Sequence, residues 1–79
     1  MNILFFAQIK DAAGMDRMDL TVVGQPDVAQ LWSHLCEALP LLQPYRQSTR
    51  LAKNGEYAGA DTRFCNQDEV ALIPPVSGG

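Results

Sequence analysis

One segment of this chain, residues 27–40, shows a helical pattern with a single apolar face, and this restricts the fold more than any other feature. Asp27 is a favourable N-cap, Gln30 follows at the capping-box spacing, and Pro40 ends the pattern. At 100° per residue, one half of the helix carries Val28, Leu31, Trp32, Leu35, Cys36, Ala38 and Leu39. Such a helix buries one face against a second layer and leaves the other face in water.

Short segments rich in β-forming residues lie on both sides of this helix and predict the second layer. The expected strands are 2–8, 19–23, 51–53, 56–58 and 70–73. Asn54-Gly55 predicts a tight hairpin, and Pro74 and Pro75 end the last strand because proline cannot donate to a ladder.

Two connecting segments have weaker patterns. Residues 10–14 are expected to form a loop with at most one helical turn, inside an antiparallel hairpin of the first two strands. Residues 40–50 contain two prolines and no clean period, which predicts a long loop or a short irregular helix.

The order strand, strand, helix, strand, short strand, strand predicts an α+β fold, the ubiquitin-like β-grasp. We expect a mixed sheet of four to five strands with one main helix on one face. Residues 1–74 would form the domain and residues 75–79 a flexible C-terminal tail. Alternation along the first strand places Ala7 on the same face as Ile3 and Phe5. The expected core consists of Ile3, Phe5, Leu20, Val22, Val28, Leu31, Leu35, Leu51, Val70 and Leu72.

Charge and composition exclude several classes of protein. The net charge of -3 argues against nucleic acid as a partner, and no apolar run is long enough to cross a membrane. No signal peptide is recognisable, and Cys36 and Cys65 cannot build a secreted disulfide framework, so we expect a cytoplasmic protein. Residues 54–79 hold four acids against Arg63 alone, which favours a basic partner.

The chemistry that the sequence offers is sparse. It has no glycine-rich phosphate loop, no Cys-x-x-Cys pair and one histidine, so we expect no bound cofactor and no metal. His34 falls on the polar half of the helix and Cys36 borders its apolar half. Cys65 lies in a polar loop, and Asp68 and Glu69 are expected to point oppositely in a solvated turn.

The last residues, Val76-Ser77-Gly78-Gly79, leave two interpretations open. Two glycines are costly to order and pack against nothing, which is typical of a frayed end. They also fit a narrow channel, and the tail would then carry its own reactive group, the α-carboxylate of Gly79. From Pro75 to Gly79 the chain can extend about 17 Å into another protein.

The β-grasp order, the opening ILFFAQ and the ending DEVALIPPVSGG together resemble the small subunit of molybdopterin synthase, the MoaD family. The resemblance covers essentially the full length and is most specific over residues 68–79. A terminal Gly-Gly is shared by all ubiquitin-like carriers, whereas Pro-Pro-Val-Ser-Gly-Gly favours the molybdenum-cofactor branch over the thiamine branch.

The resemblance implies a sulfur carrier that acts as cosubstrate rather than as catalyst. Gly78 and Gly79 would form the reactive end, and an E1-like adenylyltransferase would consume ATP to activate the Gly79 carboxylate. A sulfur donor protein would then supply the sulfur of a thiocarboxylate. The large synthase subunit, in a heterotetramer of two small and two large subunits, would provide the acid and base groups. The sulfur would go to cyclic pyranopterin monophosphate and form the dithiolene.

Three other functions remain open on the sequence. The chain could be a sulfur carrier of the thiamine pathway, or a modifier that forms isopeptides with lysines. It could also be a plain interaction module with an idle tail.

The partner surface is expected on the sheet face opposite the helix, where alternation places Leu4, Phe6, Ala71 and Ile73. An alternative is that residues 40–50 fold over this face. The resemblance implies partner contacts at Phe6, Tyr57, Ile73, Pro74, Pro75, Val76 and Ser77. Glu56, Asp68 and Glu69 would form an acidic rim around it. Lys53 stands where the family commonly has a small aliphatic residue.

Overall fold

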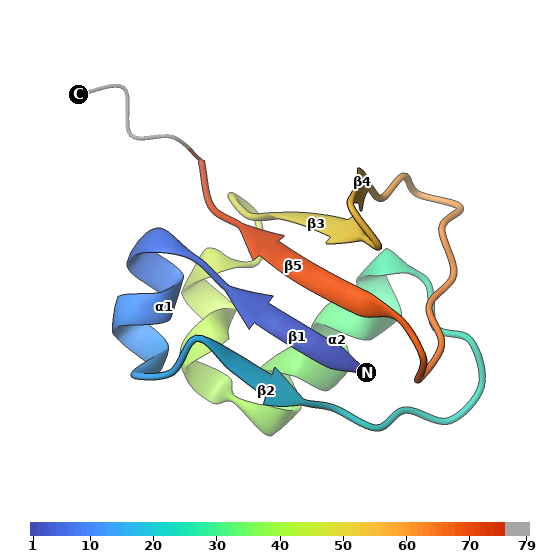
Figure 1. The fold of residues 1–79 in the computed structure, drawn as a ribbon, viewed down its shortest axis with the longest axis horizontal. Helices are drawn as coiled ribbons and strands as arrows, with labels where there is room; N and C mark the ends of the chain where they lie inside the picture. The colour runs from blue at the N-terminus through green and yellow to red at the C-terminus, as the bar shows by residue number, and fades with distance from the viewer. Residues whose placement is uncertain (76–79) are drawn as a thin grey trace.

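The first and the last strand of the described chain lie side by side at the centre of a five-stranded sheet, whose strand order is β2-β1-β5-β3-β4. The computed structural model describes residues 1–75. Its strands are β1 (Asn2–Phe5), β2 (Arg17–Asp19), β3 (Arg50–Lys53), β4 (Glu56–Tyr57) and β5 (Glu69–Ile73). The helices are α1 (Ala7–Ala13), α2 (Val28–Ala38) and the 3-10 helix η1 (Pro40–Tyr45). Figure 1 shows α2 and η1 lying behind one face of the sheet.

The sheet is mixed, as the sequence predicts. β1 runs parallel to β5 and antiparallel to β2, and β3 is antiparallel to both β4 and β5. A parallel pair needs a long crossover, and α2 provides it between the two hairpins. The predicted ubiquitin-like β-grasp is therefore confirmed.

Helix α2 forms as its sequence predicts. The side chain of Asp27 accepts a hydrogen bond of 2.9 Å from the backbone N–H of Gln30, and the Gln30 side chain accepts one of 2.9 Å from the N–H of Asp27. Both halves of the capping box are thus present. Leu31, Trp32 and Leu35 are buried, but Ala38 is exposed, so its expected place on the buried face is wrong. The helix ends there because Pro40 begins η1.

The core contains most of the expected residues. Leu20 and Val28 are the exceptions, because they stay half-buried at its edge. Ile9, Leu42 and Phe64 are fully buried as well, although they were not among the expected core residues. Each of the three lies outside the predicted helix and strands, and each belongs to the core cluster.

The first strand is shorter than expected. β1 ends at Phe5, and α1 replaces the rest of the predicted strand and the predicted loop. Ala7 is exposed and has a φ of +50°, so the chain turns sharply there instead of continuing the alternation. The turn lets α1 bring Ile9 back into the core, which supplies the physical reason for the departure. Gly14, with a φ of +70°, ends α1 in the left-handed C-cap.

The second strand begins two residues earlier and ends four residues earlier than expected. Its antiparallel partner β1 begins at Asn2, and the backbone N–H of Leu20 donates to the carbonyl of Met1 at 2.8 Å. Beyond Leu20 no β1 backbone remains to pair with. Val22 instead bonds through its backbone to the side chain of Asn66, with distances of 2.8 and 2.9 Å. None of the helices in residues 1–75 is long and apolar enough to span a membrane.

Candidate functional site

The sheet has one face that no helix covers in the described chain, and we call it the open face. Figure 1 looks onto it. It alternates with the core side chains of Ile3, Phe5, Val70 and Leu72. By strand register it consists of Asn2, Leu4, Arg17, Asp19, Arg50, Ala52, Tyr57, Glu69, Ala71 and Ile73.

An apolar strip runs along the middle of the open face. Leu4 lies opposite Ala71 in the parallel β1–β5 pair, and both are half-buried, as is Ile73. Phe6 follows β1 and is 47% exposed, and Tyr57 on β4 is 58% exposed. The prediction that Leu4, Phe6, Ala71 and Ile73 lie opposite the core is confirmed.

The segment 40–50 does not cover this strip. Its helix η1 packs against α1 and α2, on the other side of the sheet, and buries Leu42 there. A surface with large exposed apolar side chains between polar edges is typical of a binding site.

The chain leaves the sheet at the end of this strip. β5 ends at Ile73, Pro74 is buried and Pro75 is exposed. Pro74 therefore belongs to the body of the domain in the isolated chain, although it was expected among the partner contacts. The other expected tail residues, Val76, Ser77, Gly78 and Gly79, lie outside the described residues.

The charges around the strip differ from the expected acidic rim. Arg17 lies opposite Leu4, and Arg50 lies opposite Ile73. The Arg50 guanidinium carbon is 4.2 Å from the centroid of the Tyr57 ring, a cation–π contact. Sequence reasoning missed both arginines. Alternation about Leu51 would have placed Arg50 on this face, but Arg17 lay outside the predicted strand.

Asp68 is not part of any rim, because it is buried in the turn before β5. Its carboxylate accepts hydrogen bonds from the backbone N–H of Cys65 at 2.7 Å and from the Asn54 side chain at 3.0 Å. Lys53 Nζ lies 3.8 Å away. Burial alone would raise the pKa of Asp68, but these hydrogen bonds and the Lys53 charge together lower it below the ordinary value. Glu69 points away from Asp68, as predicted, and is exposed.

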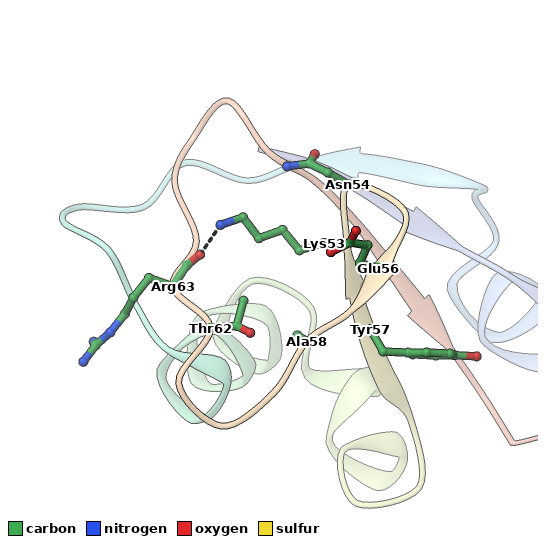
Figure 2. A pocket seen from close by; sticks show the side chains of 7 residues that line it. All are labelled: Lys53, Asn54, Glu56, Tyr57, Ala58, Thr62 and Arg63. Atoms are coloured by element: carbon green, nitrogen blue, oxygen red, sulfur yellow. Dashed lines mark hydrogen bonds between the residues drawn. The ribbon is translucent and has the colours of Figure 1, made fainter.

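Lys53 acts as a tether rather than as part of the open face. Its Nζ donates to the carbonyl oxygen of Arg63 at 2.6 Å and so holds the loop that follows β4. A polar hollow of about 540 Å³ surrounds this bond, and Figure 2 shows Lys53 and Tyr57 pointing to opposite sides of the hairpin. The Asn54–Gly55 turn that joins the two strands has positive φ at both residues, as the sequence predicts.

The remaining candidate groups do not come together. His34 is exposed, and Cys36 and Cys65 are half-buried free thiols. Within residues 1–75, no group of three or more His, Cys, Asp or Glu side chains is placed to hold a metal ion. The main candidate site among the described residues is therefore the open face, whose apolar strip ends where β5 ends.

Comparison with known proteins connects this geometry to a family. A model of the ThiS family matches residues 3–79. The molybdopterin synthase sulfur carrier subunit of Mycobacterium tuberculosis is 32% identical over 80 residues, covering 100% of this chain and 96% of that protein.

Two solved structures share the fold over the whole chain. The small archaeal modifier protein SAMP1 of Haloferax volcanii superposes with a TM-score of 0.84 and 30% identity, covering 100% of this chain and 98% of that one. One chain of the complex between subunits 1 and 2 of the Helicobacter pylori molybdopterin-converting factor gives a TM-score of 0.65 at 22% identity. That match covers 99% of this chain and 96% of the other, and it shows the fold alone.

Proposed function

The chain belongs to the ThiS family, and on that premise we propose that it is the sulfur carrier subunit of a molybdopterin synthase. The observation that carries this proposal is its whole-length similarity to sulfur carrier subunits, which extends through the Gly78-Gly79 end. The open face supports it, because its apolar strip ends where the chain leaves the sheet for that end.

The reactive group in this proposal is the α-carboxylate of Gly79. A carboxylate is a poor electrophile, so an E1-like adenylyltransferase joins it to the α-phosphate of ATP, and pyrophosphate leaves. A sulfide equivalent from a donor protein then attacks the acyl carbon and displaces AMP, which produces a thiocarboxylate. The thiocarboxylate sulfur attacks a carbon of cyclic pyranopterin monophosphate on the large subunit and displaces an oxygen substituent. Water then hydrolyses the resulting thioester, which leaves the sulfur on the pterin and returns the carboxylate. A second loaded chain supplies the second sulfur of the dithiolene in the same way. All ATP chemistry belongs to the activating enzyme.

Docking through the open face would direct the tail into the large subunit. Phe6 and Tyr57 are the most exposed large apolar side chains of this face, and Ile73 is the last residue of β5 before the chain leaves the sheet. A partner that covers the strip would therefore receive Pro75 and the residues after it. We further propose the assembly of two small subunits with a dimer of large subunits, and a cytoplasmic location.

A second candidate is a ubiquitin-like protein modifier, favoured by the full-length similarity to an archaeal modifier protein. The same activated Gly79 would then form an isopeptide with a lysine amine instead of receiving sulfur. The thiamine-pathway carrier uses the same tail chemistry, and an interaction module with an idle tail uses none of it.

One reconstitution separates these functions. The chain is incubated with an E1-like enzyme, ATP and a sulfur donor, and its intact mass is measured. We expect the mass gain of one oxygen-to-sulfur exchange, and then formation of molybdopterin when the large subunit and cyclic pyranopterin monophosphate are added. Deletion of Gly79 should abolish both steps and leave the circular dichroism spectrum unchanged.

Other outcomes identify the alternatives. Covalent ladders on other proteins without sulfur transfer would indicate the modifier. Sulfur loading without molybdopterin formation would favour the thiamine pathway. An unchanged mass would indicate an idle tail and overturn the proposal.

A further inference from the structure

The open face carries two arginines that have no acidic partner among residues 1–75, although the protein as a whole has a net charge of -3. Arg17 lies in the middle register row, opposite Leu4, and Arg50 lies in the row of Ile73, where the chain leaves the sheet. Arg17 on β2 and Arg50 on β3 flank the central strands β1 and β5. Three strand spacings separate β2 from β3, which places the two backbones about 14 Å apart across the sheet. The apolar strip lies between them.

Neither arginine is neutralised within the described chain. The only salt bridges found among residues 1–75 are those of Asp19 with the amino group of Met1 and of Asp68 with Lys53. The acidic side chains of the open face, Asp19 and Glu69, lie in the register row at its other end, around Asn2. Glu69 accepts a hydrogen bond of 3.5 Å from the Asn2 side chain.

The hollow beside Phe6 also has an excess of positive charge. A hollow of about 270 Å³ opens beside Phe6, and it is lined by Leu4, Phe5, Phe6, Lys10, Asp16 and Arg17. Two cations and one carboxylate therefore border an apolar recess at this end of the strip. On the other side, the Arg50 guanidinium lies over the Tyr57 ring and forms no salt bridge among residues 1–75. A guanidinium that stacks on a ring can still donate its N–H groups to a carboxylate.

We propose that the protein which receives the chain end presents carboxylates on both sides of an apolar patch, and that these carboxylates pair with Arg17 and Arg50 while the patch covers Phe6 and Ile73. This deepens the proposed function and rests on it, since it names the chemistry of the docking partner. The sign of the partner's charge is then opposite to the one predicted from the acidic residues 54–79, which favoured a basic partner. An arginine–carboxylate pair on each side of the strip would fix the orientation in which the tail enters the partner.

The test measures binding of the intact chain to the purified large subunit by calorimetry, at low and at physiological salt. Charge reversal by Arg50→Glu or Arg17→Glu should weaken binding at least tenfold and reduce its salt dependence. Arg63→Glu is the matched control, because it makes the same change of charge on an exposed loop residue away from the open face. We expect it to bind within about twofold of the parent.

Two further variants separate charge from packing. Arg50→Lys keeps the charge and should retain most of the affinity and the salt dependence. Arg50→Gln removes the charge and should lose both. Reversal of a partner carboxylate to lysine should restore binding of Arg50→Glu.

The inference is overturned if Arg17→Glu and Arg50→Glu bind like the parent, or if Glu69→Lys weakens binding more than either of them does. The second result would mean that the partner is basic. Failure of the parent chain itself to bind the large subunit would instead overturn the proposed function, so the two failures are distinguishable.

Discussion

The two faces of the central strands are built from neighbouring residues and have opposite roles. Phe5 is 1% exposed and packs under α2, whereas Phe6, the next residue, is 47% exposed on the other side. Val70 and Leu72 repeat the contrast with Ala71 and Ile73 along β5. Helices α2 and η1 both lie on the Phe5 side of the sheet, so within the described residues the second face keeps its large apolar side chains exposed (Figure 1).

The largest expected effect is on the free energy of unfolding, which should respond very differently to substitutions on the two faces. Phe5→Ala removes a fully buried aromatic side chain and should lower the free energy of unfolding by about 3–5 kcal/mol. Phe6→Ala removes the neighbouring exposed ring and should change it by less than about 1 kcal/mol. Urea denaturation of both variants measures this difference. Comparable losses would show that Phe6 packs into the core and that the open face is not open.

The next effect concerns binding to the partner, and here Phe6 rather than Phe5 is the important residue. Phe6→Ala should cost about 2 kcal/mol or more of affinity for the large synthase subunit, as expected when a central aromatic anchor is removed. His34→Ala, an exposed change on α2, is the control and should bind as the parent does. Isothermal titration of the three chains tests this. Equal affinities would mean that the partner uses another surface.

The alternation of the strands was visible in the sequence, and it predicted the two faces residue by residue. It failed at Ala7, because residues 7–13 contain only one large apolar side chain, Ile9, and so show no clear helical period. The position of β2 could not be predicted either, since it depends on where β1 begins. Strand positions of this kind are set by pairing partners far away in the sequence.

Charged residues were harder to place than apolar ones. The acidic run 68–69 looked solvated, but Asp68 is buried, because Cys65, Asn54 and Lys53 meet around it only after the β3–β4 hairpin has packed beside β5. Arg17 was missed for another reason, because it lies before the predicted second strand, whereas alternation about Leu51 could have placed Arg50 on the open face. The apolar strip could therefore be predicted from the sequence, and the environments of Asp68 and Arg17 could not.

Asp68 makes the stability of the protein depend on pH, because its carboxylate joins the turn before β5 to the β3–β4 hairpin through Cys65 and Asn54. Its pKa is lowered in the folded protein, so the stability from its ionised form is fully present above the ordinary, unfolded pKa of about 3.8. That stability is lost as the pH falls through the lower folded pKa. Asp68→Asn weakens the charge-assisted bonds and should cost about 1.5 kcal/mol at neutral pH.

The measurement is the urea midpoint of the parent and of Asp68→Asn between neutral and strongly acidic pH. The loss of stability of the parent on acidification should be steeper than that of the variant, because only the parent must protonate this carboxylate. Glu69→Gln is the control, since Glu69 is exposed and adjacent. Parallel curves for the parent and Asp68→Asn would contradict the proposed role of the carboxylate.

The smallest effect concerns Ala7, the residue at which the chain passes from the exposed Phe6 to the buried Ile9. Its φ of +50° is unfavourable for a residue with a Cβ atom, at a cost of about 1–2 kcal/mol, whereas glycine adopts this conformation freely. Ala7→Gly should therefore stabilise the protein by up to about 1 kcal/mol, because the relief of strain exceeds the added entropy of the unfolded chain. Ala12→Gly, at an exposed position inside α1, should destabilise it by about 1 kcal/mol. Thermal unfolding of the two variants gives the sign directly. If both glycines destabilise equally, the chain does not turn through a left-handed residue at position 7, and the mechanism that separates Phe6 from the core must be sought elsewhere in α1.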